Sequence, residues 1–259
     1  MGDTAAAIDA RAKQDSFSGV IRVDHSPELV FAEAYGFADR AHGIANSIET
    51  RFGVASATKG LTALTVVSLI QEGVLDLDTT ARSVLGPDLP LIDDAVTVEH
   101  LLAHRSGIGD YLDESSGYEV TDYMMPVSAH ELATTEQVLR VLDGFPTAFP
   151  PGTDFAYCNG GFVVLALLAE RASGIEFHEL VRARVCEPAG MNDTAFLRSD
   201  ELPGDAALGY LGDGPRTNVF HLPVLGSGDG GIYSTAADIR SLWTALFDGR
   251  IVSERWVAE

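Results

Sequence analysis

Residues 56–73 read Ser-Ala-Thr-Lys-Gly-Leu-Thr-Ala-Leu-Thr-Val-Val-Ser-Leu-Ile-Gln-Glu-Gly. Leu61, Leu64 and Leu69 recur at helical spacing, and apolar residues nearly surround the helix axis. The final glycine suits a helix end, because glycine adopts the left-handed backbone of a C-terminal cap at little cost. The stretch therefore predicts a buried central helix from Ser56 to Glu72.

The segments on either side of this helix differ in kind. Residues 18–24 and 29–36 read as two strands, and residues 25–27 (His-Ser-Pro) supply a turn, which together predict a hairpin. Residues 76–225 read as helices separated by loops rich in Pro and Gly, and a last helix is expected over residues 236–247. The helices expected between are 98–104, 135–142, 160–172 and 181–186. The outline is a hairpin, then a helical body, and a layered α/β unit that is unfinished where the chain stops.

Composition limits the possible partners. The chain has 259 residues, 38 acidic and 17 basic, with a formal net charge of −21. An ordinary apolar fraction of 46% is typical of a globular protein and not of a disordered one. So large an acidic excess argues against nucleic acid as a partner, because phosphate contacts require a basic face.

The two cysteines and the first residues bear on disulfide bonds, metal sites and cellular location. Cys158 and Cys186 are too few for a disulfide framework, and neither belongs to a C-x-x-C metal motif. Met1–Ala5 has no basic segment followed by an apolar one, and Phe162–Ala169, the longest apolar run, is too short to span a membrane. We expect a soluble protein without a membrane span, either cytoplasmic or a secreted protein in its mature form.

Lysine is scarce, which draws attention to Lys59. Lys13 and Lys59 are the only lysines, and arginine supplies the other basic residues. A desolvated lysine can release its proton and act as a base, whereas arginine stays protonated. Ser56 and Lys59 lie three residues apart and so on one helical face, and the helix N-terminus adds N–H donors for an oxyanion. The pattern indicates an activated serine nucleophile; the plainer interpretation is a capping serine followed by a surface lysine.

A second motif, Tyr157-Cys158-Asn159, stands at the start of an apolar helix. A tyrosine oxygen near a lysine can carry a proton, and an asparagine amide can hold both a lysine and a substrate carbonyl. The alternative is a tyrosine packed on the core and an asparagine that caps the next helix. By itself the motif is weak; following S-x-x-K, it is much stronger.

Three other patterns are better explained without a new activity. His100 and His104 have zinc-ligand spacing, but there is no H-E-x-x-H motif and no clear third ligand. Residues 226–231 match G-x-G-x-x-G, but too little chain follows for a dinucleotide-binding βαβ unit, so a glycine turn beside the cleft is preferred. Cys158 is expected to be a small packed residue. The sequence indicates no metal and no cofactor.

Together these motifs resemble the serine β-lactamase and penicillin-binding protein family, in particular its class C β-lactamase, DD-peptidase and esterase branch. S-x-x-K is among the signatures of that family, and Tyr157-x-Asn159 follows it after about a hundred residues. Three further stretches fit the resemblance: residues 101–108 (Leu-Leu-Ala-His-Arg-Ser-Gly-Ile), 151–157 (Pro-Gly-Thr-Asp-Phe-Ala-Tyr) and 230–238 (Gly-Gly-Ile-Tyr-Ser-Thr-Ala-Ala-Asp). The resemblance covers nearly the whole chain.

The resemblance implies an α/β (α+β) fold of the β-lactamase/DD-peptidase type, with an antiparallel sheet flanked by helices and a mostly helical subdomain. Residues 1–75 and 226–259 are expected to form the sheet region with the central helix, and residues 76–225 the mostly helical region. The third motif of the family, K-[ST]-G or H-x-G on a strand, is absent from this sequence. We therefore expect an incomplete sheet, in a chain that is truncated or incompletely recorded.

The implied function is a serine hydrolase that acts through an acyl-enzyme on a small ester or amide, as an esterase, D-amino-acid peptidase or β-lactamase. Ser56 attacks the carbonyl, Lys59 and Tyr157 handle the proton, and Asn159 binds substrate. Which of Lys59 and Tyr157 is the formal base stays open. The alternative is a non-catalytic, penicillin-recognising or scaffold protein of the same fold. The sequence does not indicate an oligomeric state.

Overall fold

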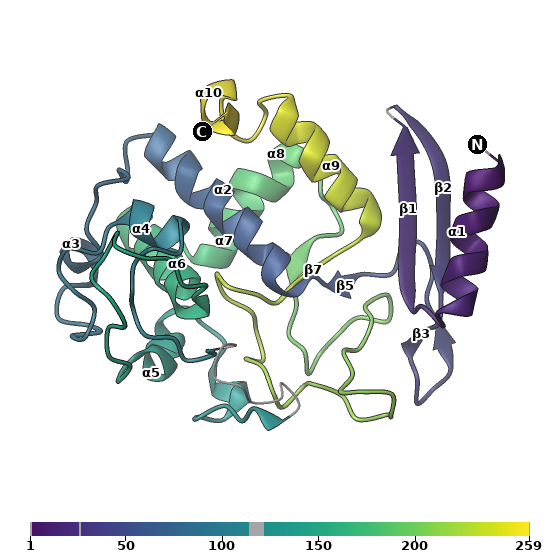
Figure 1. The fold of residues 1–259 in the computed structure, drawn as a ribbon, viewed down its shortest axis with the longest axis horizontal. Coiled ribbons are helices and arrows are strands. Elements are labelled where there is room, and N and C mark those ends of the chain that lie inside the picture. The colour runs from purple at the N-terminus through teal and green to yellow at the C-terminus, as the bar shows by residue number, and fades with distance from the viewer. Residues whose placement is uncertain (1, 26, 114–121, 259) are drawn as a thin grey trace.

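The computed structural model describes residues 2–25, 27–113 and 122–258 (Figure 1). The helices are α1 (Gly2–Gln14), α2 (Thr58–Gln71), α3 (Ala81–Leu85), α4 (Val98–Leu102), α5 (Leu139–Leu142), α6 (Asn159–Ser173), α7 (Phe177–Val181), α8 (Glu187–Ala189), α9 (Ala236–Phe247) and α10 (Glu254–Ala258). The strands are β1 (Gly19–His25), β2 (Glu28–Tyr35), β3 (Phe37–Asp39), β4 (Ile44–Ala45), β5 (Phe52–Gly53), β6 (Ala195–Phe196) and β7 (Ile232–Ser234). No helix of these described ranges is long and apolar enough to cross a membrane.

Helices α2 and α6 pack together at the centre of the body; the sequence predicts this position for α2 (Figure 1). Every residue of α6 from Asn159 to Ala169 is buried, which explains why this segment is apolar on all sides. The Cys158 Sγ accepts a hydrogen bond from the Gly161 N–H (3.3 Å) at the start of α6, and Gly174, at φ 71°, ends the helix. Both ends of α6 are thus fixed locally, and its burial positions the residues at its N-terminus.

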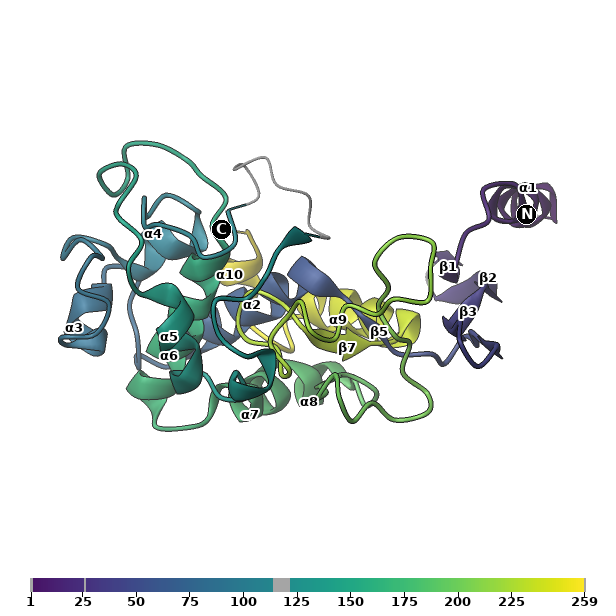
Figure 2. The ribbon, with the colours of Figure 1, turned by 90° about the horizontal axis from the view of Figure 1, so that it is seen from below.

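The strands form small antiparallel sheets. β1 pairs with β2 from Gly19↔Tyr35 to His25↔Glu28, which confirms the predicted hairpin; Ser26, in the predicted turn, lies outside the described residues. β3 pairs with β4, and the third sheet has the order β5-β7-β6. Figure 2 shows the hairpin and α1 at one end of the molecule, with α3, α4 and α5 at the other.

The third sheet determines where the central helix begins. β7 pairs with both β5 and β6, so it joins residues from widely separated parts of the sequence. The Val54 N–H donates to the Ile232 carbonyl (2.9 Å), directly before the helical turn that carries Ser56. The expected division into residues 1–75 with 226–259 and residues 76–225 stays a prediction.

Some local structure differs from the expectations. Helix α1 is not expected from the sequence. The predicted helix at 135–142 divides into a 3-10 turn, η5 (Glu136–Val138), and α5, and the helix at 181–186 consists mostly of a π-helical turn, η6 (Arg182–Cys186). Ser56 lies in a 3-10 turn, η1 (Ala55–Ala57), that precedes α2. Hydrophobic spacing predicts that a helix exists, but it does not separate these tighter and wider turns from an α-helix.

Candidate active site

The structure brings Ser56 and Lys59 together at the N-terminus of α2. Lys59 Nζ lies 3.0 Å from Ser56 Oγ, as expected for residues three positions apart on a helical face. Ala55, directly before Ser56, has a φ of 46°, which is unusual for a residue with a Cβ atom. The strained residue turns the chain from β5 into η1 and places the exposed Ser56 side chain at the beginning of the helix.

Lys59 is buried, with 6% of its surface exposed, and its amine has three close neighbours. Besides Ser56 Oγ, Nζ lies 2.8 Å from Asn159 Oδ1 and 2.8 Å from the Asp229 main-chain oxygen. The last two atoms can only accept hydrogen bonds. A neutral amine therefore uses both of its hydrogens on these two oxygens, and its lone pair faces the Ser56 hydroxyl. In this geometry Lys59 can accept the serine proton.

Tyr157 is the second proton-carrying group in contact with Ser56. Its hydroxyl lies 2.8 Å from Ser56 Oγ, and Lys59 Nζ stands 4.9 Å from the centre of its ring. Tyr157 is 42% exposed, so this part of the site lies at the surface of the molecule. The Ser56 oxygen is thus placed between an amine and a phenol, both of which can transfer protons.

His104 supports Tyr157. The two ring centres lie 4.6 Å apart, and the His104 main-chain oxygen accepts a hydrogen bond from the Ala156 N–H (3.0 Å). The Cys158 N–H donates to His104 Nδ1 (3.1 Å), so a neutral ring carries its hydrogen on Nε2. Burial, and secondarily the charge of Lys59, lower the pKa of His104 and favour this neutral form. His104 therefore fixes the main chain on both sides of Tyr157 and packs against the Tyr157 ring.

Asn159 is the first residue of α6 and is 2% exposed. Its Nδ2 donates to the Leu112 main-chain oxygen (2.9 Å), which directs Oδ1 toward Lys59. The Asp110 carboxylate accepts from the Asn159 N–H (2.7 Å) and the Gly160 N–H (2.8 Å). Burial raises the pKa of Asp110, and these backbone donors oppose that rise. Asp110 thus holds the N-terminus of α6 beside the lysine.

The glycine-rich segment 226–231 provides the last contact to Lys59. A Cβ atom added at Gly228 would lie 2.1 Å from the Phe162 main-chain oxygen, so only glycine permits this approach to α6. The Thr62 hydroxyl donates to the Gly228 main-chain oxygen (2.7 Å). The loop is therefore fixed between α2 and α6, with the Asp229 carbonyl directed at the lysine. The expected glycine turn beside the cleft lies here.

The side chain of Asp229 makes a separate contact. The Tyr111 hydroxyl donates to the Asp229 carboxylate at 2.6 Å. Burial raises the pKa of Asp229, and burial together with the neighbouring Asp229 raises the pKa of Tyr111. Tyr111 is 8% exposed, so water is not available to replace this hydrogen bond.

We expect Tyr111→Phe to lower the free energy of unfolding by about 1–2 kcal/mol, because it leaves the Asp229 carboxyl without its donor. Urea denaturation followed by circular dichroism measures the change. Tyr35→Phe is the matched control: the Tyr35 hydroxyl also donates to an aspartate, Asp9 (3.1 Å), but at the surface, where water takes its place. Equal midpoints for Tyr111→Phe and the control would contradict a structural role for the Tyr111–Asp229 pair.

Ser56, Lys59, Tyr157 and Asn159 are predicted from the sequence, and the structure brings all four together. The sequence does not identify His104, Asp110, Tyr111 or Asp229 as parts of the site. His104 lies in residues 101–108, which fit the family resemblance, and Asp229 lies in the predicted glycine turn at residues 226–231. Neither stretch indicates which side chain contacts which, because the contacts join segments far apart in the sequence.

The other sequence candidates have structural contacts. His100 Nδ1 accepts the Thr97 N–H (3.3 Å) in a capping box at the start of α4. Burial raises the pKa of Cys158 and of Cys186 to about 12, which makes both thiols poor nucleophiles at neutral pH.

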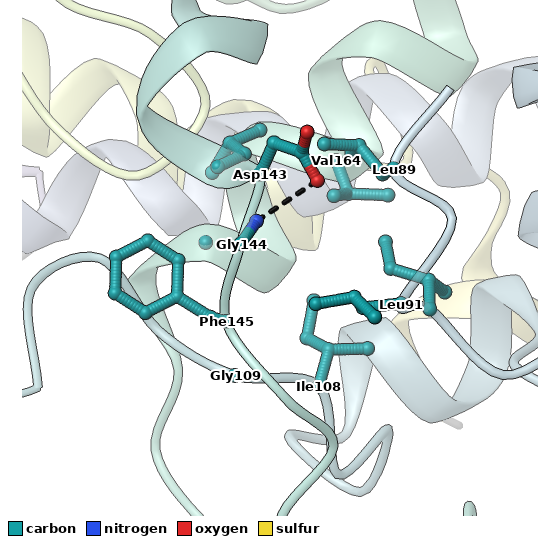
Figure 3. A pocket seen from close by; sticks show the side chains of 11 residues that line it. Leu89, Leu91, Ile108, Gly109, Asp143, Gly144, Phe145 and Val164 are labelled. Atoms are coloured by element: carbon teal, nitrogen blue, oxygen red, sulfur yellow. Dashed lines mark hydrogen bonds between the residues drawn. The ribbon is translucent and has the colours of Figure 1, made fainter.

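A small cavity of about 10 Å³ lies near α6, lined by apolar side chains such as Leu89, Ile108 and Val164 (Figure 3). Beside it, the Gly144 N–H donates to the Asp143 carboxylate (2.8 Å). This volume corresponds to about one water molecule, so the cavity cannot hold a substrate.

Comparison with known proteins finds relatives that are similar over most of the chain. It is 28% identical over 245 residues to PbpX of Bacillus subtilis (strain 168), a penicillin-binding protein by name, covering 94% of this chain and 58% of PbpX. It is 32% identical over 202 residues to the esterase EstB of Burkholderia gladioli, covering 75% of this chain and 51% of EstB. The chain thus spans little more than half the length of these curated relatives.

A solved structure is also similar. The crystal structure of a penicillin-binding protein from Bacillus halodurans matches with a TM-score of 0.90 and 37% identity, covering 97% of this chain and 77% of that chain. The family model described as Beta-lactamase matches residues 4–258. The chain therefore belongs to the Beta-lactamase family.

Proposed function

We propose that this chain carries the active site of a serine hydrolase that forms an acyl-enzyme with a small ester or amide. One observation supports the proposal most strongly: Ser56 Oγ lies 3.0 Å from Lys59 Nζ and 2.8 Å from the Tyr157 hydroxyl. Because the other two neighbours of Nζ are fixed acceptors, a neutral Lys59 directs its lone pair at the serine. The names of the relatives, which include an esterase, agree with this chemistry.

In the proposed acylation, Ser56 Oγ bonds to the substrate carbonyl carbon and its proton passes to Lys59 Nζ. The carbonyl oxygen becomes an oxyanion, which accepts a hydrogen bond from the Ser56 main-chain N–H at the start of the helix. The oxyanion then re-forms the carbonyl as the bond to the leaving group breaks, and Lys59 returns the proton to that group through Tyr157. An ester of Ser56 results.

Deacylation reverses the roles. A water molecule gives a proton to Tyr157 as Tyr157 passes its own hydroxyl proton to Lys59, and the water oxygen bonds to the acyl carbon. The bond to Ser56 Oγ then breaks as this oxygen takes that proton from Lys59, and the carboxylic acid leaves. Asn159 Oδ1 holds Lys59 Nζ in place through both steps. Neither half of the cycle uses a metal or a cofactor. A cytoplasmic location stays a prediction.

Covalent labelling tests the proposed function. We expect a fluorophosphonate probe, and benzylpenicillin more slowly, to add one adduct mass to the folded chain, because each contains an electrophile that accepts a serine oxygen. Trypsin releases residues 52–59 as one peptide, in which fragment ions distinguish Ser56 from Thr58. The heat-denatured chain is the control, since the site exists only in the folded state.

Other results would exclude the hydrolase. A chain that binds penicillin without any adduct would instead be a non-catalytic, penicillin-recognising protein. An adduct that appears equally on the denatured chain would show that the probe reacts without the folded active site.

A further inference from the structure

A second cavity, of about 650 Å³, lies between the segments 123–130 and 216–224. Its volume falls within the range typical of small-molecule sites. Most of its lining is apolar, including Met125, Val127, Val219 and Val224. Met124 and Phe220, which also line it, are 82% and 85% exposed. Large apolar side chains left in water around a cavity are typical of a surface that binds an apolar group.

The charges around this cavity are not balanced. Asp200 lines it, but Arg198 already holds both oxygens of that carboxylate, at 3.1 and 2.9 Å. Arg216 also lines it, and no carboxylate of the residues that the structure describes lies within 4.0 Å of its guanidinium. In a chain with a net charge of −21, most arginines face a carboxylate, as the ion pairs of Arg22, Arg51 and Arg171 illustrate. Arg216 is therefore a local positive charge at an apolar cavity.

His221 fixes the position of this charge. His221 Nδ1 lies 2.9 Å from the Tyr123 main-chain oxygen, which can only accept, so Nδ1 carries the hydrogen. Nε2 then has a lone pair and accepts from Arg216 Nη2 at 3.0 Å. One of the five guanidinium N–H groups is used in this way, and among the described residues no other group is hydrogen-bonded to the Arg216 side chain.

The cavity is joined to the candidate active site by consecutive hydrogen bonds. The Tyr123 hydroxyl donates to the Tyr111 main-chain oxygen (3.1 Å), and the Tyr111 hydroxyl donates to the Asp229 carboxylate. The main-chain oxygen of Asp229 contacts Lys59. Two tyrosines thus link the wall of the cavity to the loop that contacts the lysine.

We propose that this cavity binds the far end of the substrate acyl chain, and that Arg216 recognises a carboxylate there. The preferred substrate is then an ester or amide whose acyl group has an apolar body and an anionic end. This proposal rests on the proposed function, since it assigns the substrate of the same site. The guanidinium suits a carboxylate, because two of its N–H groups can donate in parallel to the two oxygens.

The kinetic test compares two esters of the same chain length. The p-nitrophenyl monoester of suberic acid has a free carboxylate, whereas p-nitrophenyl octanoate ends in a methyl group. We expect Arg216→Gln to lower kcat/KM for the suberate ester by about tenfold and for the octanoate ester by less than about twofold, as for a lost hydrogen-bonded charge pair. Arg11→Gln, which removes a surface arginine from α1, is the charge-matched control.

Three kinetic outcomes would overturn the assignment: an equal loss with both esters, no loss with either, or the same change in the Arg11→Gln control. An equal loss would show that Arg216 acts only on structure, since a role in recognition affects the anionic ester alone.

A binding measurement separates failure of this assignment from failure of the proposed function. Isothermal titration of suberate into the Ser56→Ala chain requires no catalysis. We expect the Arg216→Gln/Ser56→Ala chain to bind suberate about tenfold more weakly, with 1-octanol binding unchanged. Equal suberate affinity of the two chains, or no binding to either, would refute the carboxylate site even if the esters are hydrolysed. A tenfold difference in suberate affinity, together with no esterase activity in the chain that retains Ser56, would support the site and reject the hydrolase.

Discussion

Ser56→Ala is expected to reduce acylation by about a thousandfold or more while the chain stays folded, since losses of this size follow removal of a nucleophile. The substitution removes one oxygen, which lies between Lys59 Nζ and the Tyr157 hydroxyl. Ser56 is exposed and precedes α2, so its hydroxyl supports no buried packing. The initial burst of p-nitrophenol from an ester measures acylation, and the urea midpoint measures the fold.

Ser241→Ala, on α9, is the matched control, since it removes the same oxygen from a residue outside the described contacts of the site. A loss of less than about tenfold for Ser56→Ala would rule out Ser56 as the nucleophile, because the remaining activity would need another attacking group.

Lys59→Arg is expected to be nearly as damaging as Lys59→Ala, and both variants should be acylated about a thousandfold more slowly than the unsubstituted chain. Arginine retains the positive charge but has no lone pair at any accessible pH, so it cannot accept the serine proton. The 6% exposure of Lys59 also leaves little room for a guanidinium. Pre-steady-state acylation rates of the two variants give the comparison.

The chain contains its own control for this substitution. Lys13→Arg changes the other lysine, which is exposed and pairs with Asp9 (2.8 Å) on α1, and should leave activity unchanged. If Lys59→Arg retains most of the activity, then Lys59 contributes charge alone and the proton must go elsewhere.

The sequence predicts the site residues better than it predicts their surroundings. Ser56 and Lys59 are neighbours through helical spacing, which is a local property, and Asn159 begins a helix whose apolar run is visible in the sequence. The contacts of His104 with Cys158 and of Tyr111 with Asp229 depend on tertiary folding. Single-sequence periodicity carries no information about such pairs.

The fold shows the same division between local and distant information. The hairpin, α2, α6 and α9 follow from turn residues and apolar spacing, and all four are present. The β5-β7-β6 sheet does not follow, because its strands have only two or three residues and no pattern of their own. Pairing across the sequence, and not strand propensity, creates this sheet.

The close contact between Gly228 and α6 has a consequence for how the site responds to genetic change. Lys59 is held on one side by the carbonyl of Asp229, and every amino acid has such a carbonyl. Replacing residue 229 removes the bond to Tyr111 but cannot delete the oxygen that faces the lysine. The neighbouring glycine, which has no room for even one added carbon, is where a mutation can reach that oxygen. In an alanine scan, the loss of this lysine contact therefore appears at Gly228 and not at Asp229, although Asp229 makes the contact.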